Sequence, residues 1–163
     1  MTALEVVCAR VDNRLVHGQI LEVWVPKLSA EVIVVADDEV ATNTLMRSAM
    51  QIALPRQMRL LVARVEDVAA AVQDAGPGRA LVLFRDIKEA VRAHDAGLAF
   101  TALDVGNVHF MPGRKPITPS IYLAQDEIEA LGKLAATGVQ VEIRTLPSDR
   151  PLSLFAGVFA KGA

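Results

Sequence analysis

Two arginines, an aspartate and a histidine lie within residues 10–19, a stretch that reads RVDNRLVHGQ. A neutral imidazole is a competent nucleophile, and an arginine side chain binds anions through a planar set of N–H donors. His17 follows Arg14 by three residues and Asp12 by five. This combination predicts phosphoryl transfer through a phosphohistidine at His17, with Arg14 holding the anion beside it.

The same stretch separates a predicted strand from a predicted helix. Residues 4–11 form an apolar run typical of a buried parallel strand, and residues 18–28 have helical spacing. In an open α/β sheet, ligands bind at the carboxyl ends of the strands. We therefore expect His17 at the ligand-binding edge of a sheet. The backbone amides of Gly18 and Gln19, at the start of the helix, favour a bound anion there.

A simpler interpretation is available for part of this stretch. Arg10 and Asp12 could form an ion pair that only fixes the loop, but this explains less well a second arginine beside a histidine. The other two histidines have weaker cases. His94 is expected on the exposed side of a helix near its end, where it favours the helix dipole. His109 falls in the loop rich in proline and glycine and could line the site, but its neighbours Val108 and Phe110 favour packing.

Apolar runs rich in β-branched residues alternate with helical patterns along the chain. The runs predict strands at 4–11, 31–36, 58–62, 79–84, 102–105 and 139–144. The helical patterns cover about 18–28, 40–53, 65–75, 86–96 and 124–136. Near-continuous apolar strands between helices are typical of a parallel sheet that is covered on both faces. We expect one α/β domain over residues 1–163, with an open, mostly parallel twisted sheet of about six to seven strands and helices on both faces.

Two segments depart from this alternation. Residues 106–120 contain two glycines and three prolines, which predicts a long irregular loop, with a short strand expected within 117–123. We expect this loop to lie over the phosphate site and to carry a positive tip at Arg114 and Lys115. The tail at 151–163 has spaced apolar residues and is expected to form a short docked helix.

Composition narrows the class of protein. The 163 residues are 52% hydrophobic and 22% charged, with a net charge of -2 and a pI of about 5.9. Binding to nucleic acid or to an anionic membrane surface needs a basic surface, so this balance argues against both. No apolar run is long enough to span a bilayer, and no signal peptide is recognisable. The single cysteine, Cys8, is expected to be a buried apolar filler, and the protein is expected to be cytoplasmic.

Other ligand classes find little support in the sequence. Asp37 and Asp38 could belong to an acidic cluster like that of a phospho-accepting receiver domain. Such a domain also needs acids after its first strand and an aspartate after its third, and Arg64, Val65 and Glu66 after the third strand do not fit. The better interpretation is an exposed turn that caps the helix beginning at Val40. Neither the dinucleotide-binding nor the P-loop glycine motif is present.

Residues 10–19 closely resemble the phosphorylation loop of the IIB component of the bacterial phosphoenolpyruvate-dependent sugar phosphotransferase system, mannose/fructose/sorbose class. Three further segments resemble the same family in the same order. They are residues 33–41, which match its second strand and acidic turn; residues 104–113, its glycine-containing loop; and residues 141–149, its C-terminal strand and tail. The resemblance covers nearly the whole chain.

The resemblance implies a phosphocarrier without a metal or organic cofactor. A phosphohistidine of a IIA partner would pass its phosphoryl group to His17, and membrane-embedded IIC and IID partners would use phospho-IIB to phosphorylate an incoming sugar. In the family, the counterpart of Arg14 contacts the phosphoryl group. The residues expected to bind phosphate or to shape the loop are Arg10, Asp12, Gly18, Gln19, Gly106 and Asn107.

Two functions fit these observations. In the first, the chain carries phosphate to an imported sugar of the mannose, fructose, sorbose or amino-sugar class. In the second, it is a regulatory phospho-acceptor whose state at His17 is recognised by a partner without sugar transfer. The sequence does not select the sugar. It also leaves open a homodimer and a peripheral position at the inner face of the membrane through IIC and IID.

Overall fold

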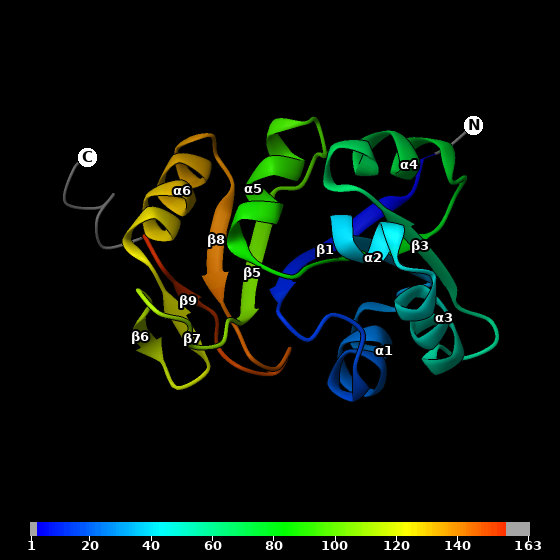
Figure 1. The fold of residues 1–163 in the computed structure, drawn as a ribbon, viewed down its shortest axis with the longest axis horizontal. Helices are drawn as coiled ribbons and strands as arrows, with labels where there is room; N and C mark the ends of the chain where they lie inside the picture. The colour runs from blue at the N-terminus through cyan, green and yellow to red at the C-terminus, as the bar shows by residue number, and fades with distance from the viewer. Residues whose placement is uncertain (1–2, 156–163) are drawn as a thin grey trace.

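The computed structural model describes residues 3–155, and seven of its strands form one sheet (Figure 1). The strand order is β3-β2-β4-β1-β5-β8-β9, and every neighbouring pair is parallel except β8 and β9. The strands are β1 (Glu5–Asp12), β2 (Val32–Ala36), β3 (Arg59–Ala63), β4 (Arg79–Phe84), β5 (Ala102–Asn107), β8 (Gln140–Ile143) and β9 (Leu152–Ser153). The expected α/β fold with a mostly parallel open sheet is confirmed.

Helices cover both faces of this sheet. One face packs against α4 (Val68–Asp74), α5 (Ile87–Asp95) and α6 (Gln125–Ala136). The other face packs against the π-helical segment η1 (Ile20–Trp24), α1 (Val25–Leu28), α2 (Asp38–Thr42) and α3 (Thr44–Ala53). A short 3-10 turn, η2 (Val65–Asp67), precedes α4. The two layers of helices explain why the central strands are apolar at every position.

Strand β2 illustrates this two-sided burial. Its side chains alternate between the two cores: Val32 and Val34 pack with α4 and α5, while Ile33 and Val35 pack with η1 and α3. All four are at most 1% exposed. A run of β-branched residues buried on both faces is the pattern from which the parallel sheet was predicted.

Two expected helices differ in detail from the structure. The helix at 18–28 is present, but its middle is wound as the π-helix η1, followed by α1 with Pro26 in its first turn. The helix expected at 40–53 is two helices, α2 and α3. They meet at Asn43, whose backbone is extended and whose Oδ1 accepts a hydrogen bond from the Met46 amide at 3.0 Å. A side-chain cap of this kind starts a new helix.

The expectation of a long irregular loop over 106–120 is wrong in part: residues 109–114 do lie outside the strands, and the short strand expected within 117–123 is present at Ile121–Leu123, but residues 106–107 and 115–118 lie in strands. Strand β5 continues through Asn107, and the following residues form a hairpin of β6 (Lys115–Thr118) and β7 (Ile121–Leu123). The hairpin is joined to β5 by a bridge between Val108 and Ile121. Proline and glycine therefore shape the turns of an ordered two-stranded sheet.

The prediction of a positive tip at Arg114 and Lys115 is wrong for Arg114. Lys115 is exposed, but Arg114 folds back onto α6, where its Nε and Nη2 donate to the two carboxylate oxygens of Glu127, each at 2.9 Å. Glu127 also accepts from the backbone amide of Ala124, which closes the first turn of α6. His109 is exposed, contrary to the expectation of packing, and contributes its backbone carbonyl to Arg114.

The tail differs from expectation as well. Leu152 and Ser153 form β9, which pairs antiparallel with β8, so the described start of the tail is a strand and not a helix. The remainder of the expected helix, residues 156–163, lies outside the described residues.

The end of β1 is the point where the connections between neighbouring strands change from one face of the sheet to the other. The chain leaves β1 toward η1 and α1 on one face, while the neighbouring strands β4 and β5 lead to α5 and α6 on the other. Adjacent strands whose connections leave toward opposite faces open a cleft at their carboxyl ends. Figure 1 shows α1 and the β6–β7 hairpin on either side of this edge.

Candidate functional site

The carboxylate of Asp12, the last residue of β1, contacts the ring of His17. Asp12 Oδ2 lies 3.1 Å from His17 Nε2, and the Asp12 side chain is fully buried while that of His17 is 16% exposed. The other oxygen, Oδ1, accepts from the backbone amide of Arg14 at 3.1 Å. One buried carboxylate therefore fixes both the loop backbone and the imidazole.

The loop between Asp12 and His17 is a tight turn. The Leu15 amide donates to the Asp12 carbonyl at 2.9 Å, and Leu15 has a φ of 56°, in the left-handed region that leucine rarely adopts. The Leu15 side chain is 2% exposed and belongs to the core under α3. Burial of this side chain holds the backbone in an unfavourable conformation, a feature that is common in functional loops.

Arg14 lies across the surface of the loop. Its Nε is 3.4 Å from Asp12 Oδ1, its Nη2 is 3.4 Å from Gln19 Oε1, and its side chain is 46% exposed. With its amide oxygen turned toward Arg14, Asn107 accepts from Arg14 Nε at 3.2 Å and donates to the Ser120 carbonyl at 3.2 Å. Asn107 thus connects the end of β5 to the loop after β1. The backbone N–H of Asn13 also donates to the backbone carbonyl of Asn107 at 3.0 Å.

Arg10 lies beneath the loop and is completely buried. Its Nη1 donates to Asp104 Oδ2 at 2.8 Å and to the Arg144 carbonyl at 2.7 Å, and its Nη2 donates to the Thr145 carbonyl at 3.1 Å. The guanidinium also stacks on the Trp24 ring, 4.3 Å from the centroid. The expected ion pair with Asp12 exists, with Nη2 3.7 Å from Oδ2, but Asp104 is the closer partner.

Asp104 is the acidic residue that sequence reasoning did not assign to the site. It stands opposite Arg10 in the parallel register of β1 and β5, and opposite Glu142 in the register of β5 and β8. Burial raises the pKa of Asp104 to about 6, against the lowering effect of Arg10. The signal was an aspartate between Leu103 and Val105 in an apolar strand, because a buried carboxylate needs a partner.

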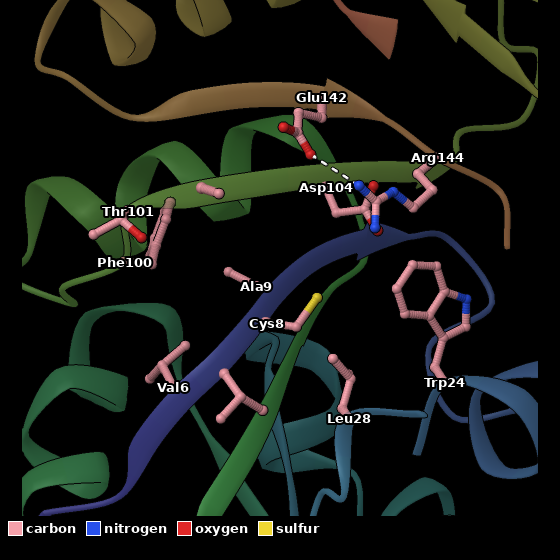
Figure 2. A pocket seen from close by; sticks show the side chains of 12 residues that line it. Val6, Cys8, Ala9, Trp24, Leu28, Phe100, Thr101, Asp104, Glu142 and Arg144 are labelled. Atoms are coloured by element: carbon pink, nitrogen blue, oxygen red, sulfur yellow. Dashed lines mark ion pairs between the residues drawn. The ribbon is translucent and has the colours of Figure 1, made fainter. Parts of the chain in front are cut away.

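A cavity of 170 Å³ opens beside Asp104 (Figure 2). Asp104 on β5, Glu142 on β8 and Arg144 just after β8 line it, and Trp24 closes one end. Cys8 lies at its floor, where burial raises the pKa of the thiol to about 12. The thiol is therefore protonated at neutral pH, but Cys8 is only partly buried and lines the cavity, whereas a buried apolar filler was expected.

The remaining predicted residues are placed as follows. Gly18 and Gln19 begin the helical stretch that runs into η1, and a Cβ on Gly18 would meet nothing within 4 Å. Gly106 lies directly under Arg10 in β5. The structure thus gathers all eight predicted site residues around the ends of β1 and β5. Among residues 3–155, no group of three or more His, Cys, Asp or Glu side chains is arranged to hold a metal ion.

The acidic turn after β2 makes its own contacts, separate from those around His17. Asp37 caps α2 as expected, accepting from the Val40 amide at 2.8 Å, but it is 1% exposed and not part of an exposed turn. Arg85 Nε donates to it at 2.8 Å, and Glu89 shares a hydrogen bond with it. Burial of Asp37 opposes its ionisation, yet the hydrogen bonds from Arg85 and Glu89 lower the pKa of Asp37 to about 2. Burial and the nearby Asp37 raise the pKa of Glu89 to about 9.

Comparison with known proteins assigns the chain to a family. The family described as "PTS system sorbose subfamily IIB component" matches residues 6–161. The chain belongs to this family of PTS IIB components. It is a phosphocarrier subunit of the phosphotransferase system, in the mannose/fructose/sorbose class, and this membership implies IIA and IIC/IID partners in general terms.

Relatives of this IIB component resemble it over most of its length. The fructose-specific EIIB component of Bacillus subtilis (strain 168) is 30% identical over 148 residues, covering 90% of this chain and 91% of the relative. The mannose-specific EIIAB component of Escherichia coli (strain K12) is 31% identical over 153 residues, covering 90% of this chain and 46% of that protein. Relatives named for two sugars are equally similar, so overall identity does not select the sugar.

A solved structure supports the same assignment. The crystal structure of manxB from Thermoanaerobacter tengcongensis matches this IIB component with a TM-score of 0.87 at 29% identity, covering 98% of both chains. Within residues 3–155, this IIB component has no helix with the length and apolar character needed to cross a bilayer.

Proposed function

We propose that His17 accepts a phosphoryl group from a phosphohistidine of a IIA partner and donates it to a sugar bound by IIC and IID. The sugar belongs to the mannose, fructose, sorbose or amino-sugar class. The observation that carries this proposal is the contact between Asp12 Oδ2 and His17 Nε2, beside the half-exposed Arg14. No other histidine in the described residues lies beside a buried carboxylate and an arginine at the end of a strand.

The contact with Asp12 supports Nδ1 of His17 as the nucleophile. A carboxylate only accepts hydrogen bonds, so Nε2 carries the hydrogen and Nδ1 carries the lone pair. No hydrogen-bond partner occupies Nδ1 among residues 3–155. Nδ1 attacks phosphorus as the phosphorus–nitrogen bond of the donor histidine breaks. The ring gains positive character in this step, and the carboxylate of Asp12 stabilises it.

Arg14 holds the transferred group. Phosphoryl transfer depends on in-line placement and on donors for the equatorial oxygens, and a planar guanidinium supplies two such donors at once. Contacts with Asp12, Gln19 and Asn107 orient Arg14, and nearly half of its side chain stays accessible to an incoming phosphoryl group. The backbone amides of Gly18 and Gln19 add positive potential at the start of the helix.

The second transfer reverses the first at His17. A hydroxyl oxygen of the sugar attacks phosphorus, the bond between phosphorus and Nδ1 breaks, and its electron pair returns to the ring. The hydroxyl proton passes to the solvent. Arg10, Asp12, Gly106 and Asn107 keep the loop in place for both steps. The reaction takes place in the cytoplasm, at the inner face of the membrane, where IIC and IID hold the sugar.

The test is transfer of labelled phosphate from phospho-IIA to the purified chain. We expect one acid-labile label, absent from His17→Ala, and a phosphorus–nitrogen coupling at Nδ1 in NMR spectra. Label that persists in His17→Ala would exclude His17 as the acceptor. Adding vesicles that contain IIC and IID with a panel of sugars should then yield a sugar phosphate. A labelled His17 that transfers to none of these sugars would favour the regulatory phospho-acceptor instead.

A further inference from the structure

Charged side chains continue inward from His17 in a connected series. His17 Nε2 meets Asp12 Oδ2 at 3.1 Å, and Asp12 Oδ2 lies 3.7 Å from Arg10 Nη2. On its other side, Arg10 Nη1 donates to Asp104 Oδ2 at 2.8 Å. The signs of Asp12, Arg10 and Asp104 alternate. Asp104 therefore contacts Arg10 at the end of the series that lies farthest from His17.

Arg10 does not need Asp104 to hold its position. Its guanidinium donates to two backbone carbonyls and stacks on Trp24, and these contacts involve no carboxylate. Trp24 is itself fixed by a hydrogen bond from its Nε1 to the Thr145 carbonyl at 3.2 Å. What Asp104 alone adds is the negative charge that competes with Asp12 for the charge of Arg10.

We propose that Asp104 is a positioning residue for His17: by sharing the charge of Arg10, it leaves the Asp12 carboxylate free to hold Nε2 of the ring. The guanidinium of Arg10 lies 2.8 Å from the carboxylate of Asp104 and 3.7 Å from that of Asp12. Arg10 therefore interacts more strongly with Asp104 than with Asp12. Without the charge of Asp104, Asp12 becomes the only carboxylate partner of Arg10 and shifts toward the guanidinium. The contact between Asp12 and His17 lengthens, and the ring loses its fixed tautomer.

The surroundings of Asp104 make its charge adjustable. Cys8 and Arg10 face it from β1, Glu142 faces it from β8, and Arg144 faces it from the segment directly after β8. Its Oδ1 is buried without a hydrogen-bond partner in the described residues, whereas Oδ2 is bonded to Arg10. Because burial raises its pKa to about 6, the carboxyl is ionised above that pH and neutral below it. The orienting effect on His17 should therefore weaken as the pH falls below about 6.

The catalytic meaning of this inference rests on the proposed function, but its primary test does not. The variant Asp104→Asn keeps the size of the side chain and removes the charge. In ¹⁵N NMR spectra of the His17 ring, we expect the share of the Nε2–H tautomer to fall toward the mixture found in a solvent-exposed histidine side chain. Transfer from phospho-IIA should slow about tenfold, the middle of the range for residues that are coupled through a shared partner.

A matched control comes from the next strand. Glu142 lines the same cavity and stands opposite Asp104 in the register, but its ion pair is with Arg144, at 3.5 Å. Glu142→Gln removes one carboxylate charge from the same face and should leave the His17 ring signals unchanged. Equal effects of Asp104→Asn and Glu142→Gln on the ring would overturn the proposal, because they would indicate a general loss of charge.

A double-mutant cycle tests the route of the effect. If Asp104 acts through Arg10 and Asp12, then adding Asp104→Asn to an Asp12→Asn background should produce no further change at the ring. An unchanged tautomer ratio in a folded Asp104→Asn single variant would contradict the proposal. If the ring changes but phosphate never reaches His17, the proposed function fails and the positioning role stands. Thermal unfolding of each variant confirms that the chain is folded.

Discussion

Gly106 lies so close to Arg10 that no larger residue fits between them. A Cβ built on Gly106 would be 2.0 Å from Arg10 Cζ and 2.1 Å from Nη2, far inside van der Waals contact. Gly106 has ordinary strand geometry, so its need for glycine comes from this close approach and not from a left-handed backbone. The buried guanidinium passes flat over β5 to reach the carbonyls of residues 144 and 145.

We therefore expect Gly106→Ala to destabilise the fold. The methyl group must displace Arg10, which has no free space because it is fully buried between Asp104, Trp24 and two carbonyls. Overpacking of this kind costs about 1–3 kcal/mol in the free energy of unfolding, which urea denaturation measures. Unchanged stability would show that Arg10 can leave its site without cost.

Gly18→Ala is the matched control for that substitution. A Cβ on Gly18 meets nothing within 4 Å, so the free energy of unfolding should change by less than about 0.5 kcal/mol. If a phosphoryl group or partner approaches the start of the helix here, the same methyl group should slow transfer from phospho-IIA. Transfer at the rate of the parent would mean that nothing approaches this position during the reaction.

Arg14→Lys should impair transfer far more than stability. Lysine keeps the positive charge but loses the planar pair of donors. The loss of a donor that stabilises the transition state costs on the order of 2–4 kcal/mol, or about thirtyfold to a thousandfold in rate. The side chain is 46% exposed, so urea denaturation should give nearly the stability of the parent. Rapid-quench measurement of transfer from phospho-IIA provides the rate, and a near-normal value would exclude this role for Arg14.

Glu89 should make stability fall as the solution becomes alkaline. Its pKa is raised to about 9 by burial and by Asp37, from an ordinary value of 4.5, so the folded state binds a proton that the unfolded state releases. This contribution is fully present below about pH 4.5 and is lost as the pH rises toward about 9. Its slope cannot exceed about 1.4 kcal/mol per pH unit for one proton.

Glu89→Gln isolates this effect, because an amide keeps a hydrogen-bond donor toward Asp37 and does not titrate. The difference in unfolding free energy between parent and variant, measured by urea denaturation from pH 5 to 9, should shift in favour of the variant as the pH rises. A constant difference across that range would contradict a protonated Glu89 in the folded protein.

Lys115 is the remaining test of the expected positive tip on the β6–β7 hairpin. Because Arg114 is paired with Glu127, Lys115→Glu is the change that alters the exposed charge without breaking a buried contact. If the hairpin steers a IIA partner, transfer should slow at low salt and recover as salt screens the charge. Lys133→Glu, near the far end of α6, is the control; equal behaviour of the two variants would remove the hairpin from docking.

Much of the fold was predictable because the signals are local. The β-branched runs of β2 and β4 and the helical spacing of α5 and α6 are properties of neighbouring residues, and the structure has these elements within a few residues of the prediction. Strand β6, its pairing with the expected strand β7, and the break at Asn43 were missed because short elements rich in proline or interrupted by a cap give little periodicity. Arg114 was misplaced because its partner, Glu127, lies on α6 in three dimensions.

By itself, the sequence determined the order of strands and helices along the chain and placed His17, Arg14 and Asp12 in one turn, because spacing along the chain decides both. Only the tertiary structure decided which strands are neighbours. The register of β1 against β5 places Asp104 opposite Arg10, and the end of β8 supplies the carbonyls that complete the guanidinium site. The partner of a buried charge lies on another strand, 94 positions away, so no local pattern identifies it.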